Sequence, residues 1–81
     1  MSEAAWKILT LFLENGWYDE KAKRRYFASW HFSKALDCKI DAANVKHNPR
    51  NEYEQALHDL IDLGLVEEMP NLGERFHLIV K

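Results

Sequence analysis

The stretch LHDLIDLGLVEEMPNLGERFHLIV, residues 57–80, changes the spacing of its apolar residues halfway along. Before Gly64, large apolar residues recur every three or four positions, which is the period of an amphipathic helix. After Met69 they fall on every second position, as in a strand with one buried face. We therefore predict a helix that ends at Gly64 in a left-handed conformation, followed by a hairpin with strands at residues 65–69 and 74–80.

The second strand of this hairpin is expected to have one apolar side, and residues 70–73 to form the turn. That side consists of Phe76, Leu78 and Val80. Arg75 and His77 are expected to point to the other side of the strand. An isolated two-stranded hairpin is only marginally stable in water, so the apolar side must lie against the helices.

The helix before the hairpin is expected to start near Asn48 and Pro49, which stand in the order of an N-cap and a first helical position. Its apolar face, expected in the core, consists of Tyr53, Leu57, Leu60 and Ile61. Its polar face consists of Arg50, Asn51, Glu54, Gln55, His58, Asp59 and Asp62. The spacing of the two sets predicts that the polar face stays in water.

Residues 3–15 form a second clear helical pattern. Its apolar stripe is Ala5, Ile8, Leu9 and Phe12, widened by Trp6 and Leu13. Ser2 is the expected N-cap, because its hydroxyl can accept a bond from a free backbone N–H of the first turn. Asn15 and Gly16 suggest a left-handed end of the helix.

The segment between these helices gives a weaker pattern. Asp19 is expected to cap a helix that starts near residue 20 and continues to about residue 36. FSKALDCK, residues 32–39, is either the last two turns of that helix or a separate short helix. Residues 40–50 are expected to be irregular.

Length and composition favour one small domain over residues 1–81, with 47% hydrophobic residues. The single cysteine fits a reducing compartment, and the apolar runs are too short to span a bilayer, so we expect a cytoplasmic protein. The net charge of −2 hides two blocks. Residues 21–50 hold eight basic and two acidic side chains, whereas residues 51–68 hold six acids and no Lys or Arg. Such blocks predict a polarised surface.

These patterns together resemble the winged helix-turn-helix superfamily. SKALDCK and YEQALHDLIDLGLVEE are similar to its short helix, recognition helix and first wing strand, including the phrase L-x-x-L-x-x-x-G-L-V-E. The resemblance implies a mainly α fold with a small β-hairpin (α+β), built from three helices and a two-stranded C-terminal wing. Two features depart from it: an insertion at residues 17–29, and a connection before the recognition helix that exceeds the usual turn of roughly three or four residues.

Catalytic and metal sites are not expected. Cys38 and the four histidines show neither C-x-x-C nor H-x-x-x-H spacing. Cys38 with His31 or His47 could form a nucleophile and base, but the sequence suggests no third group to orient the base. The glycines stand at the ends of elements instead of forming a phosphate loop. We therefore expect a protein that is not an enzyme and has no cofactor.

The first functional hypothesis is binding of duplex DNA by a small transcription regulator, as the resemblance implies. In helix-turn-helix proteins the start of the recognition helix reaches base edges, and Arg, Asn and Gln read guanine and adenine. The expected DNA-binding residues are Lys23, Arg24, Arg25, Lys34, Lys46, His47, Arg50, Asn51 and Gln55. The acids of the recognition helix and wing oppose this hypothesis, because they would meet phosphates with the wrong sign.

The alternative is a winged helix that binds protein, such as an inhibitor or mimic that acts on a nucleic-acid-handling complex in the manner of small phage proteins. It would use the acidic face of the recognition helix or the aromatic and basic segment before it. The expected contact residues are Tyr26, Trp30, Glu54, His58, Asp59 and Asp62. A homodimer, RNA binding and a purely structural role also stay open.

Overall fold

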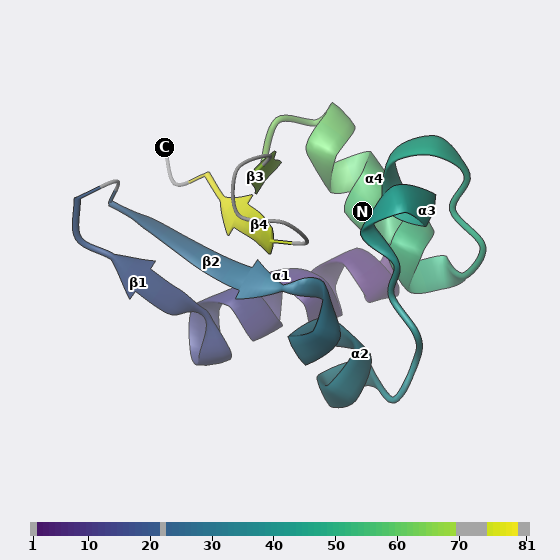
Figure 1. Ribbon diagram of the computed structural model, residues 1–81, viewed down its shortest axis with the longest axis horizontal. Coiled ribbons are helices and arrows are strands. Elements are labelled where there is room, and N and C mark those ends of the chain that lie inside the picture. The colour runs from purple at the N-terminus through teal and green to yellow at the C-terminus, as the bar shows by residue number, and fades with distance from the viewer. Residues whose placement is uncertain (1, 22, 70–74, 80–81) are drawn as a thin grey trace.

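The computed structural model describes residues 2–21, 23–69 and 75–79. Within these residues the chain forms four helices and one four-stranded antiparallel sheet (Figure 1). The elements are α1 (Glu3–Asn15), β1 (Trp17–Asp19), β2 (Arg24–Ala28), α2 (Ser29–Leu36), α3 (Ala42–His47), α4 (Glu52–Asp62), β3 (Val66–Met69) and β4 (Arg75–Leu78). The expected mixed α+β class is confirmed. The expected number of elements is too low, because three helices and a two-stranded wing were predicted, and the described residues form four helices and four strands.

Helix α1 has the predicted limits and the predicted cap. The side-chain oxygen of Ser2 accepts a hydrogen bond from the backbone N–H of Ala5 at 3.2 Å. Ile8 and Phe12 are completely buried, as the stripe predicts. The prediction that Trp6 and Leu13 widen the buried stripe is wrong, because each of these side chains is 58% exposed.

Residues 17–28 form the hairpin β1–β2, so the predicted helix over residues 20–36 is wrong in its first half. Trp17 pairs with Tyr26, and Asp19 with Arg24. Aromatic side chains favour strands, where they pack across neighbouring backbones. Asp19 accepts a bond from the N–H of Lys21 at 3.0 Å, so it shapes the turn instead of capping a helix.

Helix α3 occupies part of the stretch that was expected to be irregular. Its cap is Asp41, which accepts a bond from the N–H of Ala43 at 2.9 Å. The predicted start of α4 at Asn48 is also wrong. The side chain of Asn51 caps α4 by accepting bonds from the N–H groups of Tyr53 and Glu54. Residues 48–51 therefore connect α3 to α4.

The C-terminal half follows the prediction closely. Leu57 and Leu60 are completely buried, although Tyr53 and Ile61 are only partly buried. Gly64 has the expected left-handed backbone, with φ at 76°. Strands β3 and β4 pair with each other at the predicted place. The turn at residues 70–73, residue 74 and the side chain of Val80 lie outside the described residues.

The sheet extends beyond this hairpin, because β4 also pairs with β2, which gives the strand order β1-β2-β4-β3. Among the described residues, one face of the sheet and the helices α1, α2, α3 and α4 enclose an apolar core. The core residues of the sheet are Phe27, Val66, Phe76 and Leu78. Alternation places Tyr26, Arg75 and His77 on the opposite, outer face.

Candidate interaction surfaces

The structure divides the basic block of the sequence between two ends of the molecule. Lys23, Arg24 and Arg25 belong to the β1–β2 hairpin, whereas Lys46 and His47 end α3 and Arg50 follows it. In Figure 1 the turn of the hairpin and the α3–α4 pair lie at opposite ends of the long axis. The expected DNA-binding residues therefore do not form one continuous surface.

At the hairpin end, two of these cations are engaged by groups of the protein itself. Arg24 forms an ion pair with Glu67 of β3 at 3.4 Å. Arg25 donates to the carbonyl oxygen of Gly16 at 3.4 Å, and its guanidinium lies 5.7 Å from the ring centre of Tyr18. Exposed pairs of this kind contribute little stability but reduce the positive potential of the surface.

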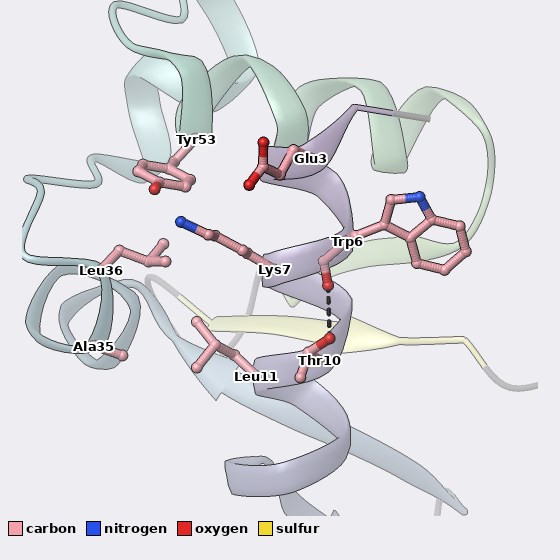
Figure 2. A pocket seen from close by; sticks show the side chains of 8 residues that line it. All are labelled: Glu3, Trp6, Lys7, Thr10, Leu11, Ala35, Leu36 and Tyr53. Carbon is pink, nitrogen blue, oxygen red and sulfur yellow. Dashed lines mark hydrogen bonds between the residues drawn. The ribbon is translucent and has the colours of Figure 1, made fainter.

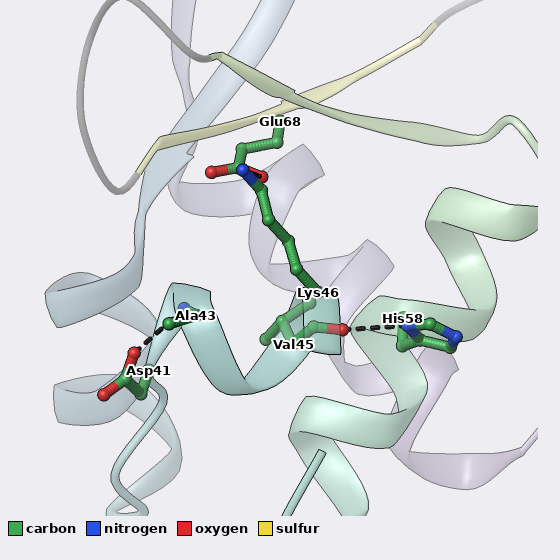
Figure 3. A network of polar contacts seen from close by, with 6 residues as sticks. All are labelled: Asp41, Ala43, Val45, Lys46, His58 and Glu68. Atoms are coloured by element: carbon green, nitrogen blue, oxygen red, sulfur yellow. Dashed lines mark hydrogen bonds and ion pairs between the residues drawn. The ribbon is translucent and has the colours of Figure 1, made fainter. Parts of the chain in front are cut away.

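At the other end, Lys46 reaches from α3 to the sheet (Figure 3). Its ammonium lies 2.7 Å from a carboxylate oxygen of Glu68, whose side chain is only 15% exposed. Glu68 is therefore engaged by the protein itself, and exchanging it for Lys would place two ammonium groups in contact.

The start of α4 offers few groups for reading bases. The oxygen of Asn51 caps the helix, and its amide nitrogen donates to the carbonyl oxygen of Lys39 at 2.9 Å. Gln55 donates to a carboxylate oxygen of Asp59 at 3.0 Å. The side chain of Arg50 is exposed next to them. Asn51 is thus a structural residue, and its assignment to DNA contact is not supported by its geometry.

Glu54 was expected on the exposed face of α4, but it is only 1% exposed. Its carboxylate accepts bonds from the backbone N–H groups of Asp41 and Arg50, both at 2.8 Å, and from the amide of Asn44 at 3.3 Å. The two backbone donors stand immediately before α3 and α4, where N–H groups lack helical partners. Glu54 therefore holds α3 and α4 together and does not reach a partner.

His58 is also less exposed than expected. Its Nδ1 lies 2.8 Å from the carbonyl oxygen of Val45, so Nδ1 carries the proton and donates (Figure 3). Its Nε2 lies 3.3 Å from Asp62, which is mostly exposed. Asp59 and Asp62 remain on the surface together with Glu52. The open side of α4 is consequently acidic.

Two exposed aromatic side chains, Trp17 and Trp30, lie together beside the outer face of the sheet. They help to line an open pocket of about 250 Å³, which we call the aromatic pocket. It is lined by Trp17, Tyr26, Ala28, Trp30, His31 and Arg75. Tyr26 and Trp30 were expected to contact a partner, and the structure brings them together. The sequence analysis did not assign Trp17, His31 or Arg75 to this site. The high density of aromatic residues at positions 17–32 is the sequence feature that indicates the pocket.

His31 contacts both exposed tryptophans of the aromatic pocket. The ring of Trp30 stacks on it with centres 3.4 Å apart, and the ring of Trp17 meets it at 4.1 Å and 71°. The guanidinium of Arg75 lies 5.7 Å from the ring centre of Tyr26. Trp30 is 61% exposed and Trp17 is 45% exposed. The pocket therefore presents flat apolar walls beside one cation.

The electrostatics of the pocket are positive. Burial lowers the pKa of His31 below its usual value, and the charges of Lys34 and Arg75 lower it further. Its imidazole is accordingly neutral at neutral pH. Nδ1 of His31 is buried and has no hydrogen-bond partner among the residues that the structure describes.

A second hollow of about 460 Å³ lies between α1, α2 and the start of α4 (Figure 2). Lys7 and Leu11 of α1 point across it towards Leu36 and Tyr53, whereas the ring of Trp6 points to the other side of α1. Glu3 and Lys7 both line it, so it has no dominant charge. This groove favours no particular partner.

The described part of the chain contains no group of three or more His, Cys, Asp or Glu side chains that could hold a metal ion. Its helices are too short or too polar to cross a membrane. No family model, curated protein or solved structure with which the chain was compared matches it.

Proposed function

We propose that this protein is a non-catalytic winged-helix module that binds a protein partner through the aromatic pocket. The observation that carries this proposal is the exposure of Trp17 and Trp30 beside Arg75. Trp, Tyr and Arg are the residue types that most often anchor protein interfaces. Large aromatic side chains gathered on the surface of a small domain with a complete core are typical of an interaction site.

The winged-helix part of the proposal is supported by the order of elements in the second half of the chain. The short helix expected at SKALDCK overlaps the end of α2, and a further helix, α3, follows it before α4. If α3 takes the place of the short helix, then α3, residues 48–51 and α4 follow one another as short helix, turn and recognition helix do. Residues 48–51 are within the range of roughly three to four residues for such turns. Gly64 then leads into the hairpin β3–β4, which corresponds to the wing. The sheet strands β1 and β2 are additions to this pattern.

Duplex DNA is the second candidate partner. It is favoured by the exposed side chains of His47 and Arg50 next to the start of α4. Against it stand the acidic side of α4, the separation of the basic residues and the structural role of Asn51. Phosphate contacts dominate affinity for DNA, so these features weaken the DNA hypothesis relative to protein binding.

The test is a pull-down from cells of the source organism with the wild type and Trp30→Ala. Trp30 is exposed, so the variant should fold, and far-ultraviolet circular dichroism checks this. We expect recovery of the partner to fall by about tenfold or more. Leu13→Ala, which removes an equally exposed apolar side chain from α1, should leave recovery unchanged.

Two outcomes would contradict the proposal. One is equal recovery of the same proteins by the wild type and Trp30→Ala. The other is tight binding of duplex DNA at physiological salt that depends on Arg50 and is insensitive to Trp30→Ala. The second outcome would establish the DNA candidate in place of the protein candidate.

A further inference from the structure

The chemistry of the aromatic pocket narrows the class of partner. We propose that the pocket takes one large apolar side chain of an acidic peptide segment, with a carboxylate of that segment beside Arg75 and Lys34. This inference rests on the proposed function, because it identifies the part of the protein partner that the same pocket binds.

The size and walls of the pocket argue for a single side chain. A volume of about 250 Å³ is below the range of about 300–1,000 Å³ in which sites for drug-sized molecules fall. Trp17, Tyr26 and Trp30 supply ring faces and edges, against which an aromatic or aliphatic side chain packs well. A polar side chain would lose its hydration there without hydrogen bonds that compensate the cost.

The cations at the pocket argue for an acidic flank. Arg24 is paired with Glu67 and Lys46 with Glu68, whereas Arg75 has no ion-pair partner within the described ranges. Lys34 lies one helical turn after Trp30 and is exposed on the same side of α2. Burial is the main reason for the lowered pKa of His31, and the charges of Lys34 and Arg75 lower it further. An incoming carboxylate would therefore meet two cations at this pocket.

The same face argues against a nucleic-acid strand. A strand requires a path of cations along its backbone in addition to stacking platforms. Burial, and then the charge of Arg24, lower the pKa of His77 on the outer face of the sheet, but the negative charges of Asp19 and Glu67 oppose that shift. A phosphate chain that extended from the pocket across the sheet would meet these acids. A peptide that inserts one side chain and presents one carboxylate needs only one cation, which Arg75 provides.

The test is selection of a displayed library of random peptides on the immobilised protein, with Trp30→Ala for counter-selection. We expect enriched peptides to carry an aromatic or leucine residue next to Asp or Glu. Replacing the acid of an enriched peptide by its amide should weaken binding to the wild type by about tenfold. The same replacement should have little effect on binding to Arg75→Gln. Trp6→Ala, an exposed tryptophan outside the aromatic pocket, is the matched control and should bind as the wild type does.

Enrichment of basic or purely apolar peptides, or no enrichment relative to Trp30→Ala, would overturn the inference. Equal discrimination between the acid and its amide by the wild type and Arg75→Gln would do the same. None of these results affects the proposed function, which the pull-down tests separately. Binding of a thymidine oligonucleotide that is lost in Trp30→Ala would overturn both and assign the pocket to single-stranded nucleic acid.

Discussion

Gly16 and Gly64 end helices for different physical reasons. Gly64 has a φ of 76°, and a Cβ there would meet no atom within 4 Å, so only the backbone conformation requires glycine. Gly16 has an ordinary φ of −69°. A Cβ at Gly16 would lie 2.4 Å from the carbonyl oxygen of Phe12, so the close approach of backbone requires glycine. The sequence predicted both positions correctly but only one of the two causes.

His77 is the residue whose titration should be visible in stability. It is 4% exposed, and burial lowers its pKa, helped by Arg24 and opposed by Asp19 and Glu67. Because the pKa is lower in the folded than in the unfolded chain, the unfolded state binds more protons below neutral pH. The free energy of unfolding should therefore decrease as the pH falls through about 6.5, and stay constant above it as far as His77 is concerned.

Urea unfolding between about pH 7.5 and pH 5.5 measures this dependence. His77→Gln should reduce the slope of stability against pH, while the similarly directed shift of His31 keeps part of it. His47→Gln, at an exposed position, should retain the slope of the wild type. A full slope in His77→Gln would refute the assignment.

At the scale of elements, helices with long apolar stripes were predictable and short elements were not. Helix α1 has 13 residues and α4 has 11, so the period of each stripe repeats several times. Helix α3 has six residues, too few for a period to be recognised. Strand β2 was mistaken for a helix and β1 was not predicted, because the pairing of β1 with β2 and of β2 with β4 is tertiary information.

The same limit applies to the aromatic pocket. Tyr26 and Trp30 were found from composition, because aromatic residues are dense in that part of the sequence. Arg75 was not, since it joins the pocket through the pairing of β4 with β2, in which it lies opposite Ala28. No local pattern contains a contact between residues so far apart in the chain.

Glu54 should be the polar side chain on which the α3–α4 unit depends most. Glu54→Ala leaves the backbone N–H groups of Asp41 and Arg50 without their acceptor in a buried site. We expect a loss of about 2–4 kcal/mol in the free energy of unfolding, measured in urea. Glu52→Ala removes an exposed acid of the same helix and should change stability by less than about 0.5 kcal/mol. Equal effects of the two changes would show that the buried carboxylate contributes nothing.

At the scale of the whole molecule, folding places the basic block of the sequence against the acidic block. Arg24 pairs with Glu67 and Lys46 pairs with Glu68, so each pair joins residues 21–50 to residues 51–68. The strongly polarised surface predicted from the charge distribution is thereby reduced. What remains is an acidic side of α4 and a positive aromatic pocket.

This arrangement predicts weak binding of duplex DNA with a definite response to charge. The wild type should show no measurable binding to random duplex at physiological salt. Asp59→Asn combined with Asp62→Asn removes two exposed acids from α4 and should raise affinity by about tenfold at roughly 50 mM salt, with a smaller effect at roughly 200 mM. Fluorescence anisotropy with a labelled duplex measures both.

The matched control is Glu3→Gln combined with Glu14→Gln, which removes two exposed acids from α1. If only the net charge matters, both double variants should gain the same affinity, because non-specific attraction depends on total charge at low salt. If α4 faces the duplex, the α4 variant should gain more. Tight binding by the wild type at physiological salt, weakened by the α4 exchange, would mean that Asp59 and Asp62 contact the DNA favourably, and the protein-binding function would have to be abandoned.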